Sequence, residues 1–341
     1  MPCPFAKIQE KRRIMRRKNV KEWKVAVLGA GTMGQCIAQF FAMKGHEVNL
    51  YNRTPANLEK AYVQIRNNLN TLLEMEEIGE EEIERAMSHI CGSSDLQASV
   101  QGVDLVIENL AEKEEVKKLI FSKLDMYCGS DVILSSDTST MNIFEFLEVS
   151  HPERLIITHF FNPAHVMPLV EVVRGPGTSD EVTADVKEFF EVSGKTVAVL
   201  NQAVPGFILN RITFAVFREA AYMASQGWTT PGEIDKAIVS TFGPRYAFEG
   251  PFALSDFAGL DVYERLGTLL PPVLCSDITC PEILKTMTAQ GKLGVKSGEG
   301  FYEYRDELKA RRDRDTRIMR MLQAIRRVET QMKGQEQDKT P

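Results

Sequence analysis

A cluster of glycines limits the possible folds of this 341-residue chain more than any other feature. The segment Gly29-Ala-Gly31-Thr32-Met33-Gly34 follows a short apolar run that is typical of a buried strand, and it opens a run with helical periodicity. In a strand–turn–helix unit the first glycine permits a tight turn, the second lets the backbone approach a pyrophosphate, and the third allows close packing. The sequence therefore predicts a dinucleotide site at the start of this helix.

The residue after the second predicted strand, 47–51, bears on which dinucleotide fits. In such units an acidic residue there hydrogen-bonds the 2′-hydroxyl of the ribose. Asn52 takes that place and Arg53 follows it. The missing carboxylate removes repulsion against a 2′-phosphate, and Arg53 offers a bidentate partner for one. These residues favour NADP over NAD, although Asn52 can also bond a ribose hydroxyl, so both cofactors stay open.

Apolar runs alternate with helical stretches in the first part of the chain, and this pattern predicts a parallel sheet with helices on both faces. The predicted strands are 24–28, 47–51, 104–108, 132–135 and 155–158. From Pro205 onward the pattern changes to long helical runs. We expect four parts: a basic arm over 1–22, a dinucleotide-binding α/β domain over 23–203, an all-α domain over 204–304, and a helix with a tail over 305–341.

The composition is that of a globular protein, and we expect it in the cytoplasm. The formal net charge of −6 argues against nucleic acid as the main partner. No apolar run reaches the roughly 18–20 residues that cross a bilayer, so we expect no membrane partner. The six cysteines include no CxxC pair and no zinc-ligand spacing, so we interpret them as free thiols and expect no metal site. The basic arm is favoured as a solvated segment over an organelle transit peptide.

Several motifs connect the chain to one enzyme family. The segment His159-Phe-Phe-Asn162-Pro-Ala-His-Val-Met-Pro-Leu-Val-Glu171 closely resembles the HFFNP…LVE signature of the L-3-hydroxyacyl-CoA dehydrogenases, which include 3-hydroxybutyryl-CoA dehydrogenases. The likeness covers most of the chain and includes the glycine segment and residues 104–108, 136–139, 205–211, 250–252 and 294–302. The resemblance implies a Rossmann-type doubly wound sheet followed by an all-α C-terminal domain. It also implies NAD as the usual cofactor, an acyl-CoA substrate and a homodimer.

Carried onto this sequence, the family pattern implies a histidine–glutamate catalytic pair. His159 would accept the proton of the 3-hydroxyl while a hydride leaves C3 for the nicotinamide, and Glu171 would hold the imidazole. Ser139 would hydrogen-bond the substrate oxygen, and Asn210 would complete the polar site. The glycine segment and the family pattern together predict these cofactor-binding residues: Gly29, Gly31, Thr32, Met33, Gly34, Asn52, Arg53, Glu112, Lys117, Asn162 and Lys296.

The chain departs from the family pattern at places that bear on its ligands. Asp137 replaces the usual asparagine before Thr-Ser, which places a carboxylate near the cofactor. In the family, a helix after the second strand helps to hold the CoA adenosine with a polar residue and a lysine. Asn68 can match the polar residue, but the lysine position falls near Met75 in an acidic run. Lys60 and Arg66 are the cations that could substitute for that lysine.

Two alternatives follow from these departures. The first is a related dehydrogenase of a free 3-hydroxy acid, of the gulonate or carnitine type, which the acidic run supports. The second is a non-catalytic binding protein, as lens crystallins of related fold illustrate. The presence of all four residues of the implied catalytic set argues against the second alternative.

Overall fold

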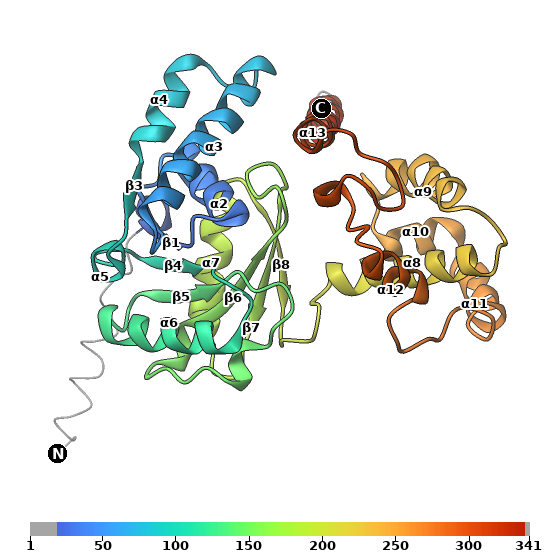
Figure 1. Cartoon of the computed structure of the whole chain (residues 1–341), viewed down its shortest axis with the longest axis horizontal. Coiled ribbons are helices and arrows are strands. Elements are labelled where there is room, and N and C mark those ends of the chain that lie inside the picture. The colour runs from blue at the N-terminus through green and yellow to red at the C-terminus, as the bar shows by residue number, and fades with distance from the viewer. Residues whose placement is uncertain (1–18, 338–341) are drawn as a thin grey trace. The chain divides into compact units, whose positions relative to one another are not determined.

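The computed structural model describes residues 19–337 and divides by its contacts into two compact units, with the boundary between Ile208 and Leu209 (Figure 1). Residues 1–18 of the expected basic arm and residues 338–341 of the expected tail lie outside the described part. The end of the arm forms a short 3-10 helix, η1 (Val20–Glu22). The four-part division expected from the sequence stays a prediction.

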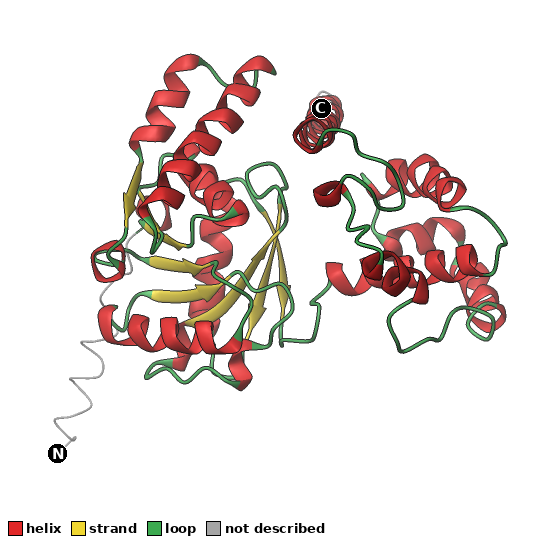
Figure 2. Ribbon diagram, viewed as in Figure 1, coloured by secondary structure: helices red, strands yellow, loops and turns green. Residues whose placement is uncertain are grey.

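Unit 1, which ends at Ile208, is built on one eight-stranded sheet of order β3-β2-β1-β4-β5-β6-β7-β8. Its strands are β1 (Val25–Leu28), β2 (Val48–Tyr51), β3 (Ile90–Ser93), β4 (Leu105–Glu108), β5 (Ile133–Ser136), β6 (Leu155–Phe160), β7 (Leu169–Arg174) and β8 (Thr196–Leu200). The Rossmann-type fold class expected from the resemblance is confirmed. Residues in β1, β4, β5 and β6 are buried at every position, because helices cover both faces of the sheet (Figure 2).

The sheet is parallel as expected except at β7, which pairs antiparallel with β6. The connection between these strands, 161–168, is shorter than the dozen or so residues that a parallel crossover needs. β8 then pairs parallel with β7. β3, β7 and β8 were not identified from the sequence, and in β3 and β8 only one residue each is fully buried.

The helices of unit 1 form two apolar layers on the sheet. They are α2 (Thr32–Met43), α3 (Pro55–Glu74), α4 (Glu80–Ser88), α5 (Leu96–Ser99), α6 (Glu114–Tyr127) and α7 (Asp180–Val192), with the short turns η2 (Ile143–Glu145) and η3 (Pro152–Arg154). One layer is aromatic, with Phe41, Phe189 and Phe190 in mutual contact. The other packs Phe121 and Leu124 of α6 against alternate residues of the central strands. These layers fix the strand ends at which the candidate site is built.

Unit 2, from Leu209 onward, is built of helices joined by loops and has no strand in its described part. Its elements are α8 (Leu209–Ser225), α9 (Pro231–Tyr246), α10 (Pro251–Ala258), α11 (Leu260–Leu269), α12 (Glu282–Ala289), η4 (Val295–Ser297) and α13 (Glu307–Gln337). The unit leaves large apolar side chains uncovered, including Phe252 at 86% and Phe257 at 80% exposure. None of the helices within residues 19–337 is long and apolar enough to span a membrane.

Candidate active site

The parallel strands of unit 1 bring several predicted site residues to one edge of the sheet. The register aligns Leu28 with Tyr51 and with Glu108, and it aligns Glu108 with Ser136. The residues that directly follow these strands therefore meet at the carboxyl edge. The strand order changes direction between β1 and β4, and open α/β sheets bind ligands at this point.

The glycine segment forms the turn between β1 and α2 as its spacing predicts. Gly29 has φ +112°, a conformation that favours glycine, and a Cβ on Gly34 would overlap the Gly29 carbonyl oxygen. Gly31 caps α2, and nothing lies within 4 Å of the place where its Cβ would be. Thr32 and Met33 form the first turn of α2. This open helix start, with its unpaired amides, fits the pyrophosphate of a dinucleotide.

Asn52 and Arg53 stand at the end of β2. The Asn52 side-chain oxygen accepts a hydrogen bond from the Thr54 amide at 3.0 Å, and Asn57 donates to the same oxygen at 3.4 Å. With its oxygen used locally, the Asn52 amide nitrogen is the group left to contact a ligand. The exposed Arg53 guanidinium forms no ion pair with any of the side chains described between residues 19 and 332.

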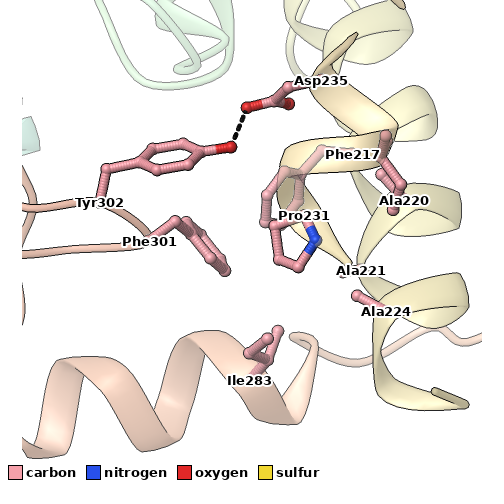
Figure 3. Close-up of a pocket in the computed structure, with 10 residues that line it drawn as sticks. Phe217, Ala220, Ala221, Ala224, Pro231, Asp235, Ile283, Phe301 and Tyr302 are labelled. Atoms are coloured by element: carbon pink, nitrogen blue, oxygen red, sulfur yellow. Dashed lines mark hydrogen bonds between the residues drawn. The ribbon is translucent and has the colours of Figure 1, made fainter. Parts of the chain in front are cut away.

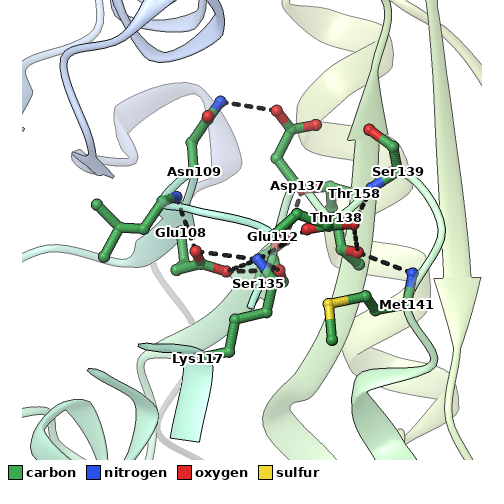
Figure 4. A network of polar contacts seen from close by, with 12 residues as sticks. Glu108, Asn109, Glu112, Lys117, Ser135, Asp137, Thr138, Ser139, Met141 and Thr158 are labelled. Atoms are coloured by element: carbon green, nitrogen blue, oxygen red, sulfur yellow. Dashed lines mark hydrogen bonds and ion pairs between the residues drawn. The ribbon is translucent and has the colours of Figure 1, made fainter. Parts of the chain in front are cut away.

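A buried ion pair lies below the ends of β4 and β5 (Figure 4). The Glu108 carboxylate, 0% exposed, accepts hydrogen bonds from Lys117 Nζ at 2.8 and 3.1 Å and from Ser136 Oγ at 2.6 Å. Lys117, 1% exposed, also lies 3.3 Å from a Glu112 carboxylate oxygen. Lys117 was predicted to line the cofactor, and the structure places its ammonium between two carboxylates.

Glu112 connects this ion pair to the loop that carries Ser139. One carboxylate oxygen accepts hydrogen bonds from the Thr138 hydroxyl, from the Ser139 amide at 3.0 Å and from the Thr140 amide at 3.3 Å. Burial alone would raise the pKa of Glu112, but these donors and Lys117 outweigh it and lower the pKa. Glu112 is therefore charged at neutral pH and holds the Ser139 loop in place.

The half-buried Asp137 forms a second acidic position between the ends of β5 and β6. Its two oxygens accept hydrogen bonds from the Phe160 amide and from the Asn109 side chain, both at 2.7 Å. Burial raises the pKa of Asp137 well above its ordinary value, and the nearby carboxylates of Glu108 and Glu112 raise it further. These surroundings therefore destabilise the charged form of Asp137, which stands where the family pattern has a neutral asparagine.

Replacing Asp137 with Asn should stabilise the protein at neutral pH. A raised pKa in the folded state means that the contribution of Asp137 is fully present at acid pH and is lost as the pH rises through the raised value. Asn is neutral throughout and can keep both hydrogen bonds if the Asn109 amide turns over. We expect Asp137→Asn to raise Tm at pH 7 by about 2–4 °C, with a smaller difference at acid pH. Exposed Asp131→Asn is the control, and an unchanged or lower Tm for Asp137→Asn would contradict this interpretation.

His159 and Glu171 face each other as a register pair of β6 and β7. His159 Nδ1 lies 2.8 Å from a Glu171 carboxylate oxygen, and both side chains are buried. The other Glu171 oxygen accepts the Ile208 amide at 3.0 Å, which fixes the carboxylate. Because Nδ1 donates to the carboxylate, Nε2 is the ring nitrogen that can accept a proton.

Two aromatic rings enclose the His159 imidazole. The ring centroids of Phe161 and Phe207 lie 4.5 and 5.5 Å from it. Phe207 is buried with φ +48°, a conformation that is rare for aromatic residues. The sequence interpretation assigned neither ring a role, although Phe207 belongs to the Pro-Gly-Phe motif of the resemblance. The rings restrict the imidazole to the orientation in which Nδ1 meets Glu171.

The other predicted residues are placed as follows. Ser139 and Asn162 are exposed in the loops that follow β5 and β6. Asn210 is half-buried at the start of α8, and Lys296 is exposed in η4, so both belong to unit 2. Their roles stay predictions from the family pattern.

Unit 2 also contains an apolar cavity of about 90 Å³ (Figure 3). Residues of α8, α9 and α12 line it, together with Phe301 and Tyr302. The Tyr302 hydroxyl donates a hydrogen bond to Asp235 at 2.6 Å. None of the predicted site residues is among those that line the cavity.

Comparisons with known sequences agree with the geometry in both units. Residues 24–203 match the family model of the 3-hydroxyacyl-CoA dehydrogenase NAD binding domain. Residues 206–304 match the model of the 3-hydroxyacyl-CoA dehydrogenase C-terminal domain. Helix α13 lies beyond both matched ranges.

Individual relatives cover nearly the whole chain. A 5-formyl-3-hydroxy-2-methylpyridine 4-carboxylate 5-dehydrogenase of Mesorhizobium japonicum is 33% identical over 89% of this chain and 97% of its own. A probable 3-hydroxybutyryl-CoA dehydrogenase of Bacillus subtilis is 37% identical over 83% of this chain and 98% of its own. A crystal structure of a dehydrogenase for the same pyridine compound, described as an NAD⁺-dependent dismutase, has a TM-score of 0.82. It is 28% identical and covers 89% of this chain and 99% of its own. The chain belongs to the 3-hydroxyacyl-CoA dehydrogenase family of nicotinamide-dependent oxidoreductases.

Proposed function

We propose that the protein catalyses the reversible NAD(P)-dependent oxidation of a short-chain (S)-3-hydroxyacyl-CoA, such as 3-hydroxybutyryl-CoA, to the 3-ketoacyl-CoA. The observation that carries the proposal is the buried hydrogen bond of 2.8 Å between His159 and Glu171. Oxidation of an alcohol releases a proton as well as a hydride, and a held imidazole is a suitable base for that proton. The 3-hydroxybutyryl-CoA dehydrogenases among the relatives support the substrate class.

In this reaction His159 Nε2 takes the proton of the 3-hydroxyl group. Glu171 stabilises the resulting imidazolium and keeps the ring from turning. Ser139, on the loop anchored by Glu112, is proposed to hydrogen-bond the substrate oxygen, and Asn210 is proposed to complete the polar site. The nicotinamide, when bound, accepts the hydride.

For the cofactor we propose that NADP is accepted at least as well as NAD. The exposed Arg53, which has no ion pair within the described residues, supports this proposal, because a guanidinium can bind a 2′-phosphate with two hydrogen bonds. The Asn52 amide nitrogen can donate either to that phosphate or to a ribose hydroxyl. NAD is the other proposed cofactor, because residues 24–203 match the NAD binding domain of the family.

Asn52→Asp should shift the protein toward NAD. A carboxylate at this position accepts the ribose hydroxyl and repels a 2′-phosphate. We expect the ratio of kcat/KM for NADH to that for NADPH to rise at least about tenfold. Arg53→Ala is the companion variant and should lower kcat/KM for NADPH alone. An unchanged ratio in both variants would show that these residues do not select the cofactor.

A second candidate is the dehydrogenase of a free 3-hydroxy acid, and the structure of α3 and α4 favours it. Arg66, which could have held a CoA phosphate, forms an ion pair with Glu84 at 2.7 Å. The Asn68 amide donates to Gln39 at 2.9 Å, and its oxygen accepts from Gln64 at 2.9 Å. Lys60 remains exposed. The relative from Mesorhizobium japonicum supports a substrate without CoA, because its name specifies a free pyridine carboxylate.

The two substrate classes are separated by comparing (S)-3-hydroxybutyryl-CoA with free (S)-3-hydroxybutyrate, each with NAD and NADP. If CoA binding contributes to catalysis, kcat/KM should be about a hundredfold or more higher for the thioester. Equal values, or turnover of the free acid alone, would establish the second candidate instead.

We also propose that the protein forms a homodimer through unit 2. The exposure of Phe252, Phe257 and Leu269 supports this, because soluble monomers rarely leave such side chains uncovered together. A cytoplasmic location stays a prediction from the sequence.

A further inference from the structure

Lys195, directly before β8, is a buried cation that the proposed chemistry does not use. It is 6% exposed, and its Nζ donates hydrogen bonds to the carbonyl oxygens of Ala164 at 2.6 Å and Met167 at 2.7 Å. The Phe40 ring centroid lies 4.0 Å from Nζ. Two carbonyl groups and one aromatic face thus match the three N–H groups of an ammonium.

This ammonium is held without a counter-ion. Among the side chains described between residues 19 and 332, no acidic group forms an ion pair with Lys195. Burial lowers the pKa of Lys195 to about 7, and the like charge of Lys44 contributes to the lowering. The neighbouring His165 stays neutral at physiological pH, because burial and the charge of Lys195 lower its pKa to about 4. Burying a charge costs free energy of folding, so an apolar side chain at this position would stabilise the fold more. The presence of a lysine indicates that its two hydrogen bonds have a role.

The two carbonyl groups lie on the segment 161–168, which connects β6 to β7. His159 is on the first of these strands and Glu171 is on the second, so the course of this connection sets their register. A slip of one residue would turn one of the two side chains to the opposite face of the sheet. The backbone next to Lys195 also fixes the connection, because the Thr196 amide donates to the Pro168 carbonyl at 2.8 Å.

We infer that Lys195 is a positioning residue for the candidate catalytic pair, because its ammonium clamps the β6–β7 connection at Ala164 and Met167 and so holds His159 opposite Glu171. For its effect on turnover the inference rests on the proposed function. Its effect on the imidazole does not, because the hydrogen bond between His159 and Glu171 can be observed without any substrate.

The test compares Lys195→Met with Lys195→Arg and with the control Lys187→Met, an exposed lysine on α7. Imidazole nitrogen NMR signals report the protonation of each ring nitrogen, and the chain has only five histidines to assign. Lys195→Met should change the His159 Nδ1 signal and lower kcat about tenfold or more, with the KM for the nicotinamide within about twofold of wild type. Lys195→Arg keeps a charged donor and should restore most of both properties, and Lys187→Met should change neither.

A wild-type His159 signal and wild-type kcat in Lys195→Met would overturn the inference. If that variant does not fold, the test is the ¹⁵N NMR signal of the Lys195 ammonium in the wild-type protein, recorded at a pH below the lowered pKa of Lys195. A slowly exchanging signal coupled to two carbonyl carbons would support the clamp, and a rapidly exchanging one would refute it. If the wild-type protein turns over no tested substrate, the proposed function fails, while the NMR comparison still decides the role of Lys195.

Discussion

Replacing His159 with Gln should lower kcat by about 10²–10⁴-fold, the contribution typical of a general base. The Gln amide can still donate a hydrogen bond to Glu171, so the buried carboxylate keeps a partner and the fold is expected to persist. It offers no group that titrates near neutral pH, so the proton of the substrate hydroxyl has no acceptor. Nicotinamide affinity should stay within about twofold of wild type, because the glycine segment proposed to bind the cofactor follows β1 and does not include His159.

The control for this prediction is His151→Gln. His151 is an exposed histidine of the same unit, and its Nδ1 lies 3.0 Å from a Glu153 carboxylate oxygen. This variant should keep wild-type kinetics. Turnover of His159→Gln near the wild-type rate would contradict the proposed catalytic role of His159 and Glu171. An inactive wild-type protein that binds nicotinamide would instead revive the alternative of a non-catalytic binding protein.

Lys117→Met should produce the largest loss of stability, about 3–5 kcal/mol in the free energy of unfolding. The substitution leaves Glu108, which is fully buried, with an unpaired charge beside the carboxylate of Glu112. Equilibrium unfolding in urea measures the loss. A change of the expected size would shift the midpoint far enough to be unambiguous.

Two further variants separate this explanation from a general effect of removing a lysine. Lys118→Met removes the next lysine of α6, which is exposed and pairs with Glu114, and it should cost less than about 1 kcal/mol. The double variant Glu108→Gln, Lys117→Met removes both charges and should recover much of the lost stability. A single Lys117→Met variant as stable as Lys118→Met would show that the buried pair does not stabilise the fold.

The parts of the fold that could be predicted are those that depend on local patterns of residues in the sequence. The apolar runs that became β1, β4, β5 and β6 are buried on both faces, so each appears as a continuous hydrophobic run. The glycine segment was predictable for the same reason, because each glycine has a local steric cause. The direction of β7 was not predicted, since it depends on the shortness of the 161–168 connection, which was not identified as a connection.

Local sequence patterns alone did not predict the main contacts of the candidate site. The pairing of His159 with Glu171 came from the resemblance, because neither residue stands out by its neighbours, and the antiparallel register that aligns them is a tertiary property. Lys117 and Lys195 are both buried, yet lysine is usually exposed and no local pattern marks these two as exceptions. The acceptors of Lys195 lie 31 and 28 residues away along the chain, and the Glu108 partner of Lys117 lies on another element, β4.

Under the proposed function, the protein transfers a hydride between a nicotinamide and the C3 carbon of a 3-oxoacyl compound. The most direct test mixes purified wild-type protein with acetoacetyl-CoA and follows the absorbance of NADH and NADPH in separate reactions. We expect the wild-type protein to consume at least one reduced nicotinamide and the His159→Gln protein to consume it about 10²–10⁴-fold more slowly. If wild-type protein binds a nicotinamide but consumes neither cofactor, the 3-oxoacyl-CoA assignment is contradicted, and the free hydroxy acid becomes the substrate class to test.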